Sequence, residues 1–171
     1  MVANTIAKSP VGNYQIMLKL THLRHVLLAT VLGMSCANAA YAEPTAKLTV
    51  VVNGITHQKG EICLRVYASE KGFPMSNTGE VQSGCTKITG TTVTKVFSGL
   101  KPGTYAVAVV DDQNGDRKLN KDFFGVPTEG FGMSKNPTVS IQTGAPKFRN
   151  VSFPMKKNTT INIFMKYSLD S

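Results

Sequence analysis

The sequence has few of the residues that catalytic and metal sites usually need. Its 171 residues include three histidines, and only His57 follows residue 42. A zinc site needs several His or Cys ligands at suitable spacing. A Ser–His–Asp triad would have to recruit His57, which we expect to be solvated in a polar turn. The Gly-x-Ser-x-Gly elbow of α/β-hydrolases is absent from the sequence. We therefore predict a protein that is not an enzyme.

Positive charge is in excess, but it is spread along the chain. The formal net charge of +9 falls to +6 when the first 42 residues, which contain Lys8, Lys19, Arg24 and no acid, are removed. Lysines that lie singly along a chain are typical of a solubilising surface and of protected edge strands, not of a nucleic-acid track. No motif that combines aromatic and basic residues is present. We expect no nucleic-acid partner.

The first 42 residues have the features of an export signal. Basic residues precede the apolar run 26–34, and Ala40 and Ala42 then give the small-x-small pattern that signal peptidase requires. Cleavage is therefore predicted after Ala42. The apolar run has about nine residues, whereas a permanent membrane-spanning helix needs roughly 20. We predict a mature chain, residues 43–171, that forms one domain, has no transmembrane span and is periplasmic or extracellular.

The start and the processing of this segment have alternatives. Met17 would begin a more typical signal sequence than Met1 does, so translation from Met17 stays open. Lipoprotein processing at Cys36 is a rival to cleavage after Ala42. The three residues before Cys36 are Gly-Met-Ser, however, and they lack the usual Leu. We favour cleavage after Ala42.

Two cysteines, Cys63 and Cys85, follow the signal segment. In an oxidising compartment, a small even number of cysteines predicts a disulfide. Closing a loop of about 22 residues would add roughly 3 kcal/mol to the free energy of unfolding in the chain-entropy model. The alternative is a pair of buried free thiols. Because export is predicted, we expect the disulfide.

Strand patterns and turn signals dominate the rest of the chain. Ile62, Leu64 and Val66, for example, alternate with residues of the opposite face. The predicted strands are 47–53, 61–67, 91–97, 105–110, 138–142, 148–153 and 160–167. Short strands at regular spacing are typical of a β-sandwich. We predict an all-β, antiparallel sandwich of immunoglobulin, fibronectin-III or prealbumin type, with one long acidic loop rich in Gly and Phe.

A Leu-x-Pro-Gly-x-Tyr turn precedes the most apolar of these strands and consists of Leu100, Pro102, Gly103 and Tyr105. It resembles the tyrosine corner of immunoglobulin-like sandwiches, in which the Tyr hydroxyl bonds to the backbone a few residues upstream. The alternative is an ordinary Pro-Gly turn before a core Tyr. Both interpretations give the same fold class.

Five of the ten acidic residues lie between Asp111 and Gly132. Alternating Asp and Asn side chains in this stretch match a calcium-loop register, in which oxygens converge on one ion. Arg117 and Phe123 depart from that register, because they stand where Gly and a bidentate Glu are usual. The candidate Ca²⁺ ligands are Asp112, Asn114, Asp116, the carbonyl of Lys118, Asn120 and Asp122. The alternative is a set of Asx turns, in which these side chains accept bonds from nearby backbone N–H groups.

The second half of the loop, residues 123–132, has three Phe and three Gly. Its Phe rings are either anchors that fold the loop back onto the sandwich or an exposed aromatic platform. The candidate binding surface is Phe123, Phe124, Glu129 and Phe131. Its expected partner is an envelope or extracellular ligand, either a glycan or a protein.

The segment from Leu100 to Ser134 combines Leu-x-Pro-Gly-x-Tyr, Asp-x-Asn-Gly and Phe-Gly-x-Pro-x-Glu-Gly-x-Gly-x-Ser. In this combination it resembles the domain of unknown function 2141 family of secreted bacterial proteins, and the likeness extends from Lys47 to Tyr167. The resemblance implies fold and export, but no activity. Asn120 replaces an acidic residue of the usual family loop, and Met133 replaces an aromatic one. These two departures weaken any cation site that the resemblance implies.

Two hypotheses for function follow. The first is an exported binding or envelope-associated structural protein that acts through the loop 111–134, with Ca²⁺ as a candidate ordering ion. The second is a secreted hydrolase in which Asp116 and Glu129 form a pair of catalytic carboxylates.

Overall fold

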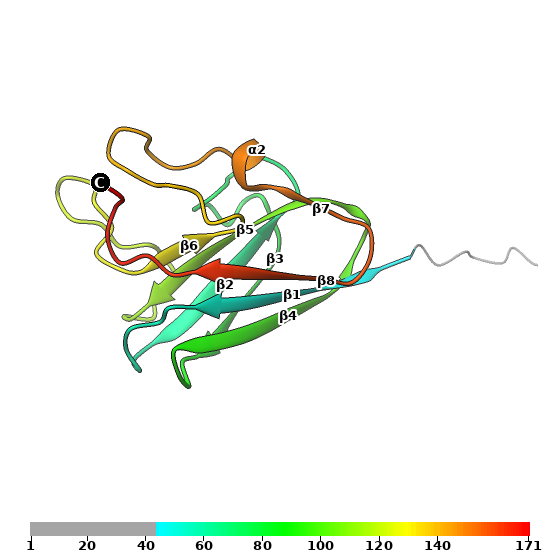
Figure 1. Ribbon diagram of the computed structural model, residues 1–171, viewed down its shortest axis with the longest axis horizontal. Coiled ribbons are helices and arrows are strands. Elements are labelled where there is room, and N and C mark those ends of the chain that lie inside the picture. The colour runs from blue at the N-terminus through cyan, green and yellow to red at the C-terminus, as the bar shows by residue number, and fades with distance from the viewer. Residues whose placement is uncertain (1–43) are drawn as a thin grey trace, which may run out of the picture. The chain divides into compact units, whose positions relative to one another are not determined.

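Short segments of alternating apolar residues build two β-sheets that pack face to face (Figure 1). The computed structural model describes residues 44–171. The predicted signal segment lies outside the described residues, and with it Met17, Cys36 and the cleavage site. The strands fall into two layers and helix is almost absent from the described range, so the predicted β-sandwich is confirmed.

The first sheet has three strands in the order β4 (Thr92–Leu100), β1 (Ala46–Asn53) and β8 (Thr159–Phe164). The central strand β1 is antiparallel to β4 and parallel to β8. One face of β1 is buried, because Leu48, Val50 and Val52 alternate with more exposed residues. This pattern is the period of two that a half-buried strand requires.

The second sheet is built around β5 (Gly103–Asp112), which leads directly into the acidic loop. Along one side of β5 lie β2 (Glu61–Tyr67) and then β3 (Glu80–Lys87). Two short strands, β6 (Phe131–Met133) and β7 (Phe153–Met155), pair with different parts of β5. The one helix of residues 44–171 is the single turn α2 (Phe148–Val151). None of the described helical structure is long and apolar enough to cross a membrane.

Four predicted strands, 47–53, 61–67, 91–97 and 105–110, correspond to β1, β2, β4 and β5. The predicted strand 160–167 corresponds to β8, which ends earlier at Phe164. The predictions for 138–142 and 148–153 are wrong in large part. Residues 138–140 have no regular structure and lead into a turn at 141–143, where the Ser140 hydroxyl accepts a bond from the Thr143 N–H. Residues 148–151 form the helix α2.

The second sheet is buried on both faces along its central strands β2 and β5, which explains the nearly continuous apolar sequence of β5. Its inner face packs against the first sheet in the main core, where Val107 and Val109 are fully buried. Its outer face carries Tyr67, Ala106 and Ala108, and these residues form a second core with residues from the long connections, which cover that face. The predicted alternation in β2 is confirmed, since its aliphatic residues face the main core and Tyr67 faces the second.

Two predicted covalent and hydrogen-bonded features are present. Cys63 and Cys85 stand opposite each other on β2 and β3 and are joined by a disulfide. The Tyr105 hydroxyl donates to the carbonyl of Lys101 at 2.7 Å, as expected for a tyrosine corner. Both features lie within or beside the strands that support the acidic loop.

Candidate functional site

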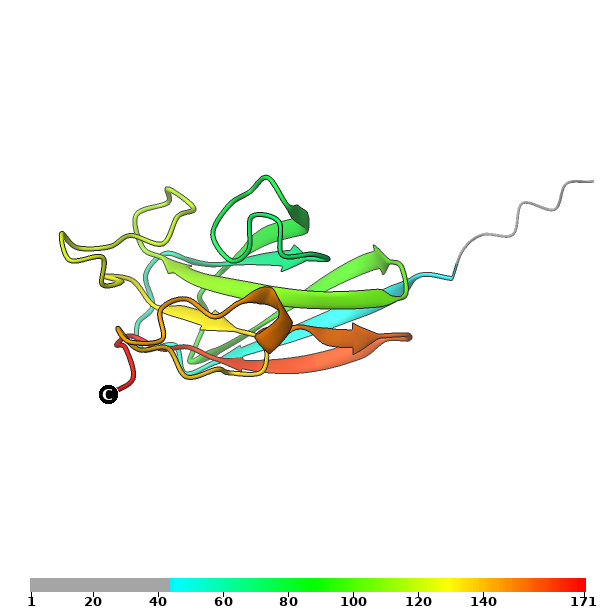
Figure 2. The same ribbon diagram turned by 90° about the horizontal axis from the view of Figure 1, so that it is seen from above.

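The acidic loop connects β5 to β6 and projects from one end of the sandwich. Figure 2 shows it at the same end as the connection 134–147 and the carboxyl terminus. Its two ends are fixed, because Asp111 and Asp112 at the end of β5 are buried, and the Asp111 N–H donates to the carbonyl of Gly130. A rigid sheet therefore holds an exposed loop, an arrangement in which binding residues are often found.

Asp112 organises the first turn of the loop. Its carboxylate accepts hydrogen bonds from the backbone N–H groups of Gly115, at 2.8 Å, and Arg117, at 2.9 Å. Gly115 and Arg117 both have positive φ, of 81° and 58°. Arg117 thus adopts the left-handed conformation for which the calcium-loop register usually has Gly, at a conformational cost that Gly would avoid.

Three predicted ligands converge on one another. The Asp116 carboxylate accepts bonds from the side-chain amides of Asn120, at 3.1 Å, and Asn114, at 3.3 Å. It also accepts a bond from the backbone N–H of Lys118 at 2.8 Å. The pKa of Asp116 is lowered, first by this bond from Lys118 and then by the two Asn amides and the positive charge of Lys118. Asp116 is thus held in its ionised form at the centre of an Asx network.

Asp122 lies apart from this group. Its carboxylate accepts bonds at 2.9 Å from the backbone N–H groups of Phe124 and Val126, so it caps its own turn nearer the tip of the loop. Asp122, a candidate ligand that stands outside the calcium-loop register, thus has its hydrogen bonds in a different turn from Asn114 and Asp116.

Glu129 is buried, in contrast to its predicted place on a binding surface. Its two carboxylate oxygens accept bonds at 3.1 Å from the backbone N–H groups of Gln113 and Asn120. Glu129 thus holds both halves of the loop together from the inside. Because both oxygens accept backbone hydrogen bonds, Glu129 has the contacts of a structural residue. These contacts give no support to the pairing of Glu129 with Asp116 that the hydrolase hypothesis requires.

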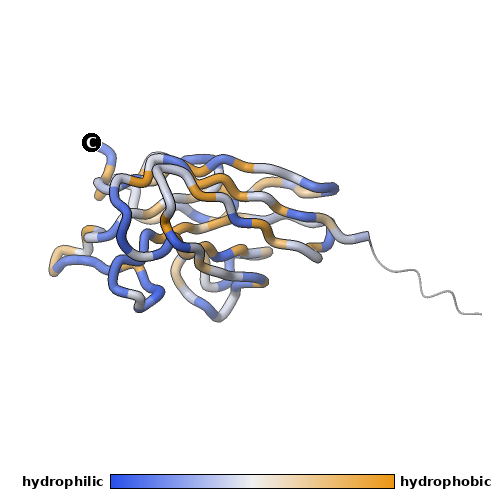
Figure 3. The backbone as a smooth tube through the Cα atoms, turned by 90° about the horizontal axis from the view of Figure 1, so that it is seen from below, coloured by the Kyte–Doolittle hydropathy of each residue, from blue (hydrophilic) through white to orange (hydrophobic). Residues whose placement is uncertain are grey.

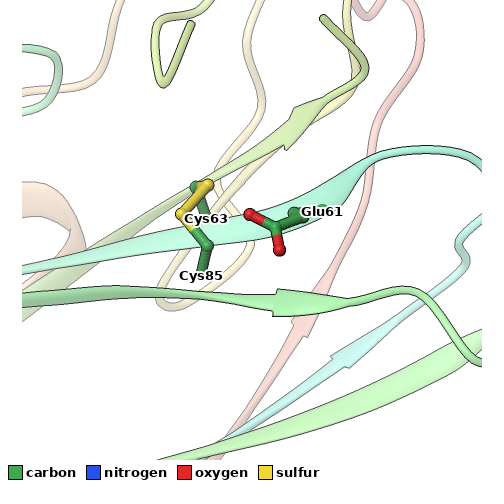
Figure 4. Close-up of side chains that lie close together, drawn as sticks. All are labelled: Glu61, Cys63 and Cys85. Atoms are coloured by element: carbon green, nitrogen blue, oxygen red, sulfur yellow. A yellow bond between two sulfur atoms is a disulfide. The ribbon is translucent and has the colours of Figure 1, made fainter. Parts of the chain in front are cut away.

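One other group of potential metal ligands occurs in residues 44–171, and it lies on the sheet. Glu61, Cys63 and Cys85 have ligand atoms within 4.8 Å of one another (Figure 4). The disulfide engages both sulfur atoms, and a thiolate is the form of cysteine that binds metals. This group is therefore not a metal site in the oxidised protein.

The three Phe of the loop divide between the two predicted roles. Phe131 is only 2 % exposed and belongs to the second core, so it is an anchor and not part of a binding surface. Phe123 and Phe124 are 96 % and 86 % exposed and pack edge to face, with ring centroids 5.5 Å apart. Figure 3 shows that the surrounding loop is largely hydrophilic. These two rings form an exposed aromatic tip.

An apolar cavity of about 210 Å³ lies beside this tip. One wall comes from the acidic loop and includes Phe124, and another comes from the connection after β6 and includes Ile141, which is 77 % exposed. Lys121 is the one charged residue of the lining. We call Phe123, Phe124, Ile141 and this cavity the apolar surface. Ile141 was not predicted, because a single Ile between polar residues carries no sequence signal for a binding role.

A model of the family described as an uncharacterised protein conserved in bacteria, DUF2141, matches residues 50–162. The chain belongs to the DUF2141 family. The resemblance predicted from the turn and loop motifs is therefore confirmed, and the match includes the whole acidic loop. No curated protein and no solved structure matches the chain.

This DUF2141 protein also has a polar cluster around the buried Asp111 that sequence reasoning missed. His57 was expected to be solvated, but its Nε2 lies 2.8 Å from Oδ2 of the fully buried Asp111. The Tyr167 hydroxyl donates to the same oxygen at 2.6 Å. Burial, followed by the bond to Asp111, raises the pKa of Tyr167. The three residues are far apart in sequence, so no local motif indicates the cluster.

Proposed function

We propose that the protein is an exported binding protein and that the apolar surface is its recognition site. One observation carries the proposal. Phe123, Phe124 and Ile141 are the three most exposed large hydrophobic residues of the described chain. Phe124 and Ile141 line one cavity, and Phe123 packs against the ring of Phe124. Isolated exposed apolar residues are ordinary on protein surfaces, whereas a contiguous patch marks an interaction site.

Three features support export to the periplasm or the extracellular space. The sequence begins with the features of a signal peptide, the disulfide joins β2 to β3, and the family is bacterial. Disulfides persist in oxidising compartments such as the periplasm. An envelope-associated structural role would use the same exposed surface, since attachment to another envelope component also requires a recognition site.

The lining of the cavity favours an apolar partner over a glycan. Sugars are held by several hydrogen-bonding groups, but the lining side chains are mostly aliphatic or aromatic. The hydroxyl of Ser140, which lines the cavity, already bonds to Thr143. Lys121 can add one charge contact. The expected ligand therefore has an apolar group that enters the cavity and an anionic group that Lys121 attracts.

Calcium is part of this proposal as an ion that adds order to the acidic loop. The side chains of Asn114, Asp116 and Asn120 converge, and Arg117 has the backbone conformation of the calcium-loop register. Rotation of the two Asn amides would turn oxygens, which are the ligands Ca²⁺ prefers, toward Asp116. The Asx network already orders the loop, so Ca²⁺ would stabilise an existing arrangement.

The recognition role is tested with 8-anilinonaphthalene-1-sulfonate, a fluorescent probe that joins apolar rings to a sulfonate. Residues 43–171 form one compact unit and are the protein to use. We expect saturable binding with one probe per chain, and loss of that binding in the double variant Phe124→Ser/Ile141→Ser. The control is Phe164→Ser, which removes an aromatic ring that is 56 % exposed on β8. Equal binding by both variants would overturn the proposal.

A further inference from the structure

We propose that the apolar surface docks onto an anionic lipid bilayer, with Phe123 and Phe124 entering the interfacial region. This inference rests on the proposed recognition role of the same surface and names its partner. The acidic loop and the connection 134–147 both project at one end of the sandwich (Figures 1 and 2). Phe124 and Ile141 line one cavity and Phe123 packs against Phe124, so these three side chains are presented together at that end of the sandwich.

The aromatic tip is preformed. The Asp122 N–H donates to the carbonyl of Val126, and the Gly125 N–H donates to the carbonyl of Asp122. The Asp122 carboxylate accepts two further backbone bonds within the same turn. Lys121 and Pro127 then pair as an isolated β-bridge that closes the turn. Because the turn is already ordered, insertion of the rings would cost little additional conformational entropy.

The exposed charges of the loop differ from its composition. The loop is acidic in sequence, but Asp111, Asp112 and Glu129 are buried. Asp116 and Asp122 are the exposed carboxylates of the loop, and together they have a formal charge of −2. The exposed basic residues of the loop are Arg117, Lys118 and Lys121, and none of them forms an ion pair within residues 44–171. They exceed the exposed carboxylates by one positive charge, so the exposed part of this acidic loop is weakly basic.

This arrangement is complementary to an anionic bilayer surface. Aromatic rings partition into the interfacial region, and each nearby Lys or Arg adds attraction to anionic headgroups. The mature chain has a formal charge of +6, which adds a longer-range attraction of the same sign. Lys121 lines the cavity beside Phe124, so its ammonium group would lie at headgroup level when the ring enters the interface.

The small contact area favours a bilayer over a folded protein partner. A stable protein–protein interface buries roughly 800 Å² on each partner. Two aromatic rings bury about 150–250 Å² each, so the tip and Ile141 together fall short of that area. A bilayer adapts to a narrow protruding tip, and electrostatic attraction supplements the apolar contact.

The test is co-sedimentation of residues 43–171 with vesicles. Vesicles of phosphatidylcholine alone are compared with vesicles that also contain phosphatidylglycerol, at low and at high salt. We expect binding to the anionic vesicles that weakens in high salt. Phe123→Ser/Phe124→Ser should lower the apparent affinity about tenfold or more, and Lys118→Glu/Lys121→Glu should lower it as well. All four side chains are exposed, so the variants should unfold at the temperature of the unmodified protein.

Two matched variants control for position. Phe164→Ser removes an exposed ring on β8, and Lys156→Glu/Lys157→Glu reverses two exposed lysines in the turn between β7 and β8. That turn lies at the opposite end of the sandwich from the acidic loop (Figure 1). Phe164→Ser should not change vesicle binding. Lys156→Glu/Lys157→Glu lowers the net charge as much as Lys118→Glu/Lys121→Glu does, but it should weaken binding less, because its lysines lie away from the aromatic tip. If Lys156→Glu/Lys157→Glu weakened binding as much as Lys118→Glu/Lys121→Glu, the attraction would be general and the docking proposal would be overturned. A loss in Phe164→Ser equal to that in Phe123→Ser/Phe124→Ser would overturn it as well.

The results separate this inference from the proposed function. Vesicle binding that is absent, or unchanged in the Phe123→Ser/Phe124→Ser variant, would overturn bilayer docking. If the fluorescent probe still bound at the cavity in that case, the recognition role would stand and the partner would be a soluble ligand or a protein. If probe binding were also insensitive to Phe124→Ser/Ile141→Ser, both proposals would fail.

Discussion

The hydroxyl of Tyr167 and the carboxylate of Asp111 are joined by a 2.6 Å hydrogen bond that links the carboxyl-terminal segment to the base of the acidic loop. Asp111 is fully buried, and the same oxygen lies 2.8 Å from Nε2 of His57. The other oxygen, Oδ1, has no hydrogen-bond partner among residues 44–171. Burying a carboxylate costs free energy unless hydrogen-bond partners compensate for it. The bond from Tyr167 should therefore contribute more to the free energy of unfolding than an ordinary tyrosine hydrogen bond does.

Replacing Tyr167 by Phe tests this relationship. The substitution keeps the ring, which packs closely against Gly130, but it removes a donor from a buried charged group. We expect a loss of about 1–3 kcal/mol in the free energy of unfolding, measured in urea. Tyr105→Phe is the matched comparison, because its hydroxyl bonds to the neutral carbonyl of Lys101. Its expected loss is about 0.5–1.5 kcal/mol. An equal or larger loss for Tyr105→Phe would contradict the special role of Asp111.

The His57–Asp111–Tyr167 cluster also marks the limit of what the sequence predicts. Strands such as 61–67 are found correctly because alternation is a local signal of one buried face. The strand β3 was missed because its sequence, Glu-Val-Gln-Ser-Gly-Cys-Thr-Lys, is mostly polar. It pairs at the edge of the second sheet, where the disulfide of Cys85 joins it to β2. Such pairing depends on the partner strand and leaves little trace in local composition.

The acidic loop shows the same limit within the candidate site. Its spacing predicted either side chains that converge on an ion or a set of Asx turns. The hydrogen bonds of the loop are those of Asx turns, with Asn114 and Asn120 also bonded to Asp116. It did not predict which Phe is buried, because Phe131 pairs with β5 as part of β6, whereas Phe123 and Phe124 stand at the turn. Periodicity alone cannot separate an anchor from an exposed tip when Gly-rich backbone surrounds both.

The disulfide should stabilise the fold by an amount that grows with the logarithm of the length of chain that it closes. Cys63 and Cys85 are 22 residues apart, and the chain-entropy model gives about 3 kcal/mol for a loop of this size. Chemical denaturation with and without reductant should show a loss of that order. The variant Cys63→Ala/Cys85→Ala should be less stable than the oxidised protein and should not respond to reductant. Equal stability of the oxidised and reduced protein would refute the prediction.

The lowered pKa of Asp116 predicts a pH dependence of stability. Because the pKa is lower in the folded than in the unfolded state, the ionised carboxylate stabilises the fold above the unfolded pKa. This contribution is lost as the pH falls through the folded pKa. The difference in melting temperature between the unmodified protein and Asp116→Asn should therefore shrink as the pH falls from neutral into the acid range. A difference that stays constant across that range would show that the Asp116 carboxylate contributes nothing as an ion.

Calcium binding is tested by thermal unfolding of residues 43–171 in chelator, in millimolar Ca²⁺ and in millimolar Mg²⁺. An ion that binds only the folded state raises stability by RT ln(1 + [L]/Kd), or about 1.4 kcal/mol at ten times Kd. We expect stabilisation by Ca²⁺ but not by Mg²⁺, and its loss in Asp116→Ala, because Asp116 lies where Asn114 and Asn120 converge.

Asp122→Ala is the matched control for the calcium test. Asp122 is an exposed aspartate of the same loop, but its carboxylate caps the turn of Phe124 and Val126. Its removal should lower the melting temperature without changing the response to Ca²⁺. If Asp116→Ala and Asp122→Ala lost the stabilisation by Ca²⁺ equally, the effect of the ion would depend only on the net charge of the loop and not on a specific site. If Ca²⁺ did not raise the melting temperature of the unmodified protein, the calcium hypothesis would fail. The order of the loop would then come from the Asx network around Asp112 and Asp116 alone.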